Sequence, residues 1–104
     1  MDADELEIWR ALNELPEVKA VFGQWYIGDI CIIDKKGTLH TMQYNNPKDT
    51  HSIWVPPIFD PIRPERSLWM IAYNLGLYNL EVIASDFLRP DLALAKAIIE
   101  MEGE

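Results

Sequence analysis

The residues of this chain best suited to bind a metal are one cysteine, two histidines and two aspartates near its middle. They are Cys31, His40, His51, Asp29 and Asp34. No pair among them has a spacing typical of zinc ligands, such as two cysteines two residues apart or two histidines three residues apart. A single cysteine also excludes an intramolecular disulfide. We therefore expect no metal site and no cofactor.

Nucleophilic catalysis also lacks a clear candidate. Cys31 stands in the apolar run ICII, which predicts a buried thiol of raised pKa and low reactivity. None of the serines lies in a G-x-S-x-G motif, and the five glycines are too scattered for a phosphate-binding loop. We expect no catalytic residues and a protein that is not an enzyme. The weakest alternative is an enzyme that uses an unrecognised pair of carboxylates.

The segment from 45 to 64 is the most unusual part of the chain, because it holds five of the seven prolines. Proline fixes φ and lacks a backbone donor, so this segment cannot form a helix or a central strand. An ordinary exposed loop is polar, yet this one also carries Trp54, Ile58 and Phe59. Each such side chain contributes roughly 1.5–3 kcal/mol when it is buried. The segment therefore either covers its own core or binds another molecule.

A protein interface in this segment, over residues 53–62, is our principal functional hypothesis. Rigid aromatic side chains and prolines lose little entropy on binding. The partner would be another protein or a second copy of the chain, so a homodimer is included. The expected protein-binding residues are Trp54, Val55, Pro56, Pro57, Ile58 and Phe59.

The charge of the chain argues against nucleic acids and membranes as direct partners. The formal net charge is −8, with many acids in residues 1–17, and an acidic protein repels phosphate groups. One alternative is that Asp4, Glu7, Glu14 and Glu17 imitate nucleic-acid phosphates and inhibit a host protein. The other interpretation is the solvated face of an amphipathic helix. The acidic N-terminus does not resemble a signal peptide, so we expect a cytoplasmic protein.

The first half of the chain shows patterns of a helix and a hairpin. Leu6, Trp9 and Leu12 recur at helical spacing, which predicts an amphipathic helix over 3–15 that Pro16 ends. From Gln24 to Asp34 the pattern is β-like with apolar residues on both faces, which predicts an interior strand. The turn sequence DKKG and a second strand over 38–44 complete a predicted β-hairpin over 24–44.

The second half predicts helices over 65–75 and 90–101, each beginning near a proline, and a strand over 78–84. The helix over 65–75 is apolar around most of its circumference, so we expect it to be largely buried. Together these elements predict an α+β fold in which a small three-stranded antiparallel sheet packs with helices. A length of 104 residues predicts a single domain over 1–104.

Several short motifs together resemble a known group of proteins. They are GQWYIGD before the hairpin, IWVPPIFDPIRPERSLW in the middle and LALAKAIIEMEG at the end. The chain is similar in these motifs, over most of its length, to small uncharacterised acidic proteins of tailed bacteriophages and prophages. The resemblance implies an accessory protein that acts in the cytoplasm of a bacterial host, and it supplies no catalytic residues.

Overall fold

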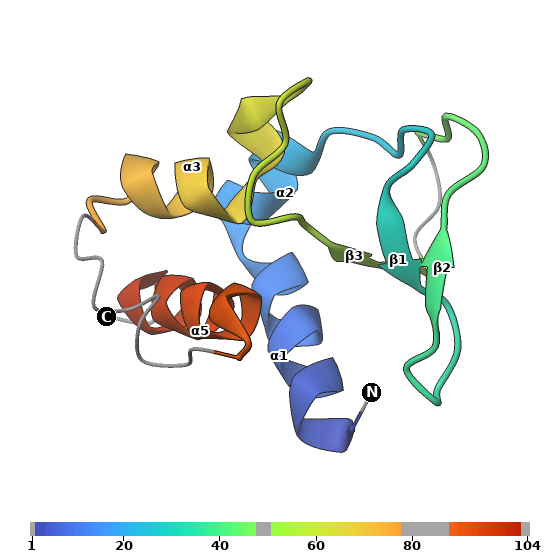
Figure 1. The fold of residues 1–104 in the computed structure, drawn as a ribbon, viewed down its shortest axis with the longest axis horizontal. Coiled ribbons are helices and arrows are strands. Elements are labelled where there is room, and N and C mark those ends of the chain that lie inside the picture. The colour runs from blue at the N-terminus through green and yellow to red at the C-terminus, as the bar shows by residue number, and fades with distance from the viewer. Residues whose placement is uncertain (1, 48–50, 78–87, 103–104) are drawn as a thin grey trace. The chain divides into compact units, whose positions relative to one another are not determined.

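The computed structural model describes residues 2–47, 51–77 and 88–102 of the chain, whose helices and strands are drawn in Figure 1. The chain divides into two compact units, Met1–Pro56 and Pro57–Glu104. The boundary falls between two adjacent prolines in the middle of the proline-rich segment. The expectation of one domain over the whole chain stays a prediction.

The first unit begins with two consecutive helices, of which the second starts at a proline. Helix α1 (Ala3–Glu14) is capped by Asp2, whose carboxylate accepts a hydrogen bond from the Glu5 backbone N–H at 2.8 Å. The predicted first helix is therefore confirmed to within one residue. Pro16 ends α1, as predicted, but it also begins a second helix, α2 (Pro16–Phe22), which the apolar pattern did not reveal. Proline suits a first helical position because the N–H that it lacks has no partner there.

Three short antiparallel strands follow in the first unit, in the order β2-β1-β3 (Figure 1). They are β1 (Ile30–Ile32), β2 (Leu39–Thr41) and β3 (Ile53–Val55). Cys31 of β1 lies opposite His40 on one side and opposite Trp54 on the other. Strand β1 is thus the central strand of the sheet, as the apolar pattern of residues 24–34 predicts.

The α+β class with a three-stranded antiparallel sheet is thus confirmed, with one change in its composition. The third strand comes from the proline-rich segment, as Ile53–Val55. The strand predicted over 78–84 lies outside the described residues. Because β3 is short and lies at the edge of the sheet, the prolines that follow it do not disturb a central ladder.

The second unit has one short 3-10 helix and two α-helices among its described residues. They are η1 (Pro64–Arg66), α3 (Leu68–Asn74) and α5 (Pro90–Glu102). Ser67 divides the helix predicted over 65–75, because its backbone is extended and its hydroxyl caps α3 by accepting from the Met70 N–H at 3.3 Å. The helix predicted over 90–101 is confirmed. Helices α3 and α5 contact each other.

One side chain, that of Asn13, joins α1 to the outer edge of β3. Its Oδ1 accepts a hydrogen bond from the Trp54 backbone N–H at 2.9 Å, and its Nδ2 donates to the Trp54 carbonyl oxygen at 2.7 Å. Nδ2 also donates to the Trp9 carbonyl oxygen at 2.8 Å. A carboxamide offers both an acceptor and a donor, as a peptide unit does. Asn13 therefore occupies the place that another strand would take beside β3.

Replacing Asn13 with alanine should lower the free energy of unfolding of the first unit by about 1–3 kcal/mol, because two part-buried backbone groups of Trp54 lose their partner. Urea denaturation measures this change as a lower midpoint at an unchanged slope. Asn13→Asp keeps the acceptor and loses the donor, so it should also be destabilised.

Glu14→Ala is the matched control, because Glu14 is the exposed neighbour of Asn13 in the same helix. It should change the free energy of unfolding by less than about 0.5 kcal/mol. Equal midpoints for Asn13→Ala and Glu14→Ala would contradict the role that we assign to the carboxamide.

Candidate functional site

The structure divides the six predicted protein-binding residues between core and surface. Trp54 is only 1% exposed, and Pro56 is also fully buried. The Trp54 ring lies 5.2 Å from the Phe22 ring, and Phe22 contacts Trp25 edge-to-face at 4.8 Å, both distances between ring centroids. These contacts are all within the first unit. Trp54 and Pro56 are therefore core residues. They are not accessible to a partner, although we expected them in the binding surface.

The rest of the predicted segment is more accessible. Val55 is half-buried, Pro57 is exposed, and Ile58 lies at the lower limit of exposure. Phe59 is 57% exposed, which is unusual for a large apolar ring. Of the two aromatic residues that we expected to bind a partner, only Phe59 is available for contact.

Helix α3 adds two aromatic side chains that we expected to be buried. Trp69 is 39% exposed and Tyr73 is 52% exposed. They stand four residues apart, so they are neighbours on one face of the helix. The other face is the buried one and carries Leu68, Ile71 and Ala72. The expected burial of this helix is therefore correct for one face only.

Backbone hydrogen bonds hold α3 beside the end of the proline-rich segment. The Leu68 N–H donates to the Pro57 carbonyl oxygen at 2.9 Å, and the Trp69 N–H donates to the Ile58 carbonyl oxygen at 3.0 Å. Two free N–H groups at the start of the helix thus find their acceptors in this segment. We call the accessible set that results the exposed aromatic surface; it consists of Ile58, Phe59, Trp69 and Tyr73.

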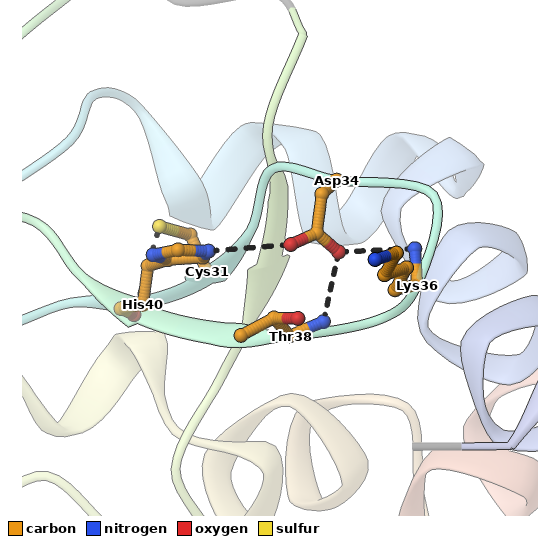
Figure 2. Close-up of polar contacts among 5 residues, drawn as sticks. All are labelled: Cys31, Asp34, Lys36, Thr38 and His40. Carbon is orange, nitrogen blue, oxygen red and sulfur yellow. Dashed lines mark hydrogen bonds and ion pairs between the residues drawn. The ribbon is translucent and has the colours of Figure 1, made fainter.

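The hairpin of the first unit brings together three of the residues that we considered for chemistry (Figure 2). The Cys31 thiol is buried and donates to the His40 carbonyl oxygen at 3.7 Å. The His40 Nε2 lies 3.6 Å from the Asp34 Oδ2, slightly beyond hydrogen-bond distance. These contacts place a thiol, an imidazole and a carboxylate along one hairpin, but the thiol is bonded to a carbonyl and Cys31 is only 2% exposed.

The turn of the hairpin depends on the carboxylate of Asp34. Its Oδ1 accepts hydrogen bonds from the backbone N–H groups of Lys36 and Thr38, each at 3.0 Å, and Figure 2 shows these bonds on the side away from His40. Gly37 completes the turn with a φ of 77°, a value that favours glycine. The Thr38 N–H is the main reason why the pKa of Asp34 falls to about 2. Asp34 therefore acts as a structural anion in a tight turn.

A shallow pocket of about 270 Å³ lies on the Cys31 face of the hairpin. Its lining contains no carboxylate, so it does not supply the acid pair that an unrecognised hydrolytic site would need. Among residues 2–47, 51–77 and 88–102, no three histidine, cysteine or acidic side chains lie close enough to hold a metal ion. The lining residues of the pocket are Cys31, Ile33, His40, Thr41, Met42, Gln43, Tyr44 and Ser52.

The acids of α1 do not form a continuous array. Arg10 Nη1 lies 2.7 Å from Glu7 Oε1, and Lys19 Nζ lies 3.6 Å from Glu14 Oε2. Each of these pairs is largely exposed, and each places a cation beside an acid that a phosphate mimic would need. This arrangement is typical of the solvated face of a helix.

Comparison of the chain with protein-family models, with curated proteins and with solved structures finds no match. The resemblance to phage and prophage proteins therefore stays a prediction. In the part of the chain that the structure describes, no helix has the length and apolar character needed to cross a membrane.

Trp54→Ala should lower the free energy of unfolding by about 3–5 kcal/mol, because it removes a fully buried aromatic ring. Phe59→Ala should change it by about 1 kcal/mol or less, because that ring is largely in solvent. Urea denaturation of both variants, followed by far-ultraviolet circular dichroism, tests the contrast. Similar losses at the two positions would show that the assignment of core and surface is wrong.

The lowered pKa of Asp34 predicts that the free energy of unfolding decreases in acid. The carboxylate stabilises the fold fully above its unfolded pKa of about 4, and this contribution is lost as the pH falls through its folded pKa of about 2. Carbon-detected NMR titration should place the Asp34 midpoint near the lower of these values. Thr38→Pro removes the principal N–H donor and should raise the midpoint. Thr38→Val keeps that donor, so it should raise the midpoint less.

Proposed function

We propose that this chain acts by binding another protein through the exposed aromatic surface. The observation that carries the proposal is the accessibility of Phe59, Trp69 and Tyr73 in one unit, on backbone that hydrogen bonds hold together. Exposed apolar patches on soluble proteins often mark sites that bind other proteins. Tryptophan and tyrosine are also the residues most enriched among those that dominate binding energy.

The partner that fits this surface is a protein with an apolar cleft and a positively charged rim. The aromatic rings would enter the cleft, where they lose contact with water. The net charge of −8 favours a basic partner through long-range attraction, which raises the association rate. Following the resemblance noted in the sequence, we propose a phage or host protein in the bacterial cytoplasm.

Affinity capture from a bacterial lysate, followed by measurements on the purified partner, tests this proposal. Phe59→Ser and Tyr73→Ser should each weaken the binding at least about tenfold, a loss of about 1.4 kcal/mol in binding free energy. Both residues are more than half exposed, so the substitutions should leave the fold intact. A shift of unfolding temperature by only a few degrees would verify this.

Ile27→Ser is the matched control, because Ile27 is an exposed apolar residue of the other unit, with 67% of its surface accessible. It should leave the dissociation constant unchanged. The proposal fails if no protein is retained, or if the wild type and all three variants bind the partner equally well.

A further inference from the structure

The two outer edges of the sheet in the first unit differ in their hydrogen bonding. At the β3 edge, the Trp54 N–H and carbonyl point away from β1 and are both bonded to Asn13. Two residues that lie opposite each other in antiparallel strands either exchange both backbone hydrogen bonds or exchange neither. Trp54 points its backbone groups away from Cys31, so Cys31 directs its own groups towards β2, where it lies opposite His40. The backbone groups of His40 therefore face inward.

The backbone groups of Leu39 and Thr41, on either side of His40 in β2, consequently face outward. The Met42 N–H donates to the Asp29 carbonyl oxygen at 2.8 Å, and the Met42 carbonyl oxygen accepts from the Gly28 N–H at 2.8 Å, so Met42 also faces β1. Leu39 and Thr41 alternate with these inward residues. Within the described part of the chain, no side chain closes this edge as Asn13 closes the other.

The β2 edge carries none of the charged residues or prolines that often protect an open strand. Natural edge strands carry lysine, other charges, proline or a bulge, which prevent pairing with another chain. From 37 to 46 the sequence GTLHTMQYNN contains no acid, lysine, arginine or proline, in a chain that is 25% charged. Leu39 and Tyr44 in this stretch are 55% and 64% exposed. An uncharged, partly apolar, open edge is suited to pairing with a strand.

We propose that β2 pairs antiparallel with β2 of a second copy of this chain, which joins the two sheets into one. A two-fold axis at His40 places Leu39 of each copy opposite Thr41 of the other, so that every outward N–H meets an outward carbonyl. The edge is thus complementary to itself without any further partner. This pairing is independent of the exposed aromatic surface, which belongs to the other unit.

The charge of the chain gives this dimer a distinctive response to salt. Each copy carries a net charge of −8, so two copies repel each other at long range, while the paired strands themselves are uncharged. Raising the ionic strength from about 0.01 M to about 0.15 M shortens the screening length from roughly 30 Å to roughly 8 Å. The dimer should therefore become tighter as salt is added, in contrast to a complex held by opposite charges.

Sedimentation equilibrium on the full chain tests the dimer, with Thr41→Pro and Thr41→Val as a matched pair. Proline at position 41 removes an outward N–H and leaves the inward ladder intact, whereas valine keeps that N–H. Thr41→Pro should weaken the dimer at least about tenfold, because the hydrogen bond is lost twice across the two-fold axis. Thr41→Val should dimerise as the wild type does.

NMR on the wild type provides a second measurement that needs no substitution. The amide hydrogens of Leu39 and Thr41 should exchange more slowly as the protein concentration rises, and Ile53 in the inner ladder should not change. The inference is overturned by a single-chain mass at every concentration. It is equally overturned by a dimer that Thr41→Pro leaves unchanged, or that forms with no added protection of these two amides.

Discussion

The first unit depends on the double hydrogen bond between the Asn13 carboxamide and the Trp54 backbone. The helix thereby supplies the sheet with the equivalent of one more peptide unit, in a partly buried place where unpaired groups would be costly. The same contact fixes the position of β3, so the Trp54 ring is held against Phe22 in the core. Together with the ladder to β1, this side chain holds the proline-rich segment at the edge of the sheet.

From that fixed point the proline-rich segment serves both units in turn. Trp54 and Pro56 are buried with the first unit, while the carbonyl groups of Pro57 and Ile58 accept the leading N–H groups of α3 in the second. The prolines reduce the conformational entropy that this segment loses on folding, because their restricted φ already limits the conformations of the unfolded chain. Phe59, which follows directly, has no comparable buried position, and its exposure is what makes the segment a candidate for binding.

Local signals in the sequence were sufficient for the hairpin turn, for the end of α1 before Pro16 and for the beginning of α5 at Pro90. The DKKG turn, Pro16 and Pro90 each act within a few residues of chain, so they can be identified without knowledge of the fold. The Asn13–Trp54 pair spans 41 positions, and an asparagine inside a helix looks merely unfavourable. For the same reason, the exchange of Trp54 for Trp69 in the candidate surface could not be predicted, because both are large apolar rings whose burial depends on tertiary contacts.

The contrast between the two sheet edges also bears on how this small protein could bind a partner. An open strand edge can pair with another chain, and Asn13 prevents this at Trp54 of β3. Pairing through β2 would give each particle two copies of the exposed aromatic surface, since that surface lies in the other unit of every chain. A partner with two clefts would then be bound at a high effective concentration after its first contact. Weak pairing of strands and modest binding by a few rings would then together give a stable complex, because the second contact forms within the same particle.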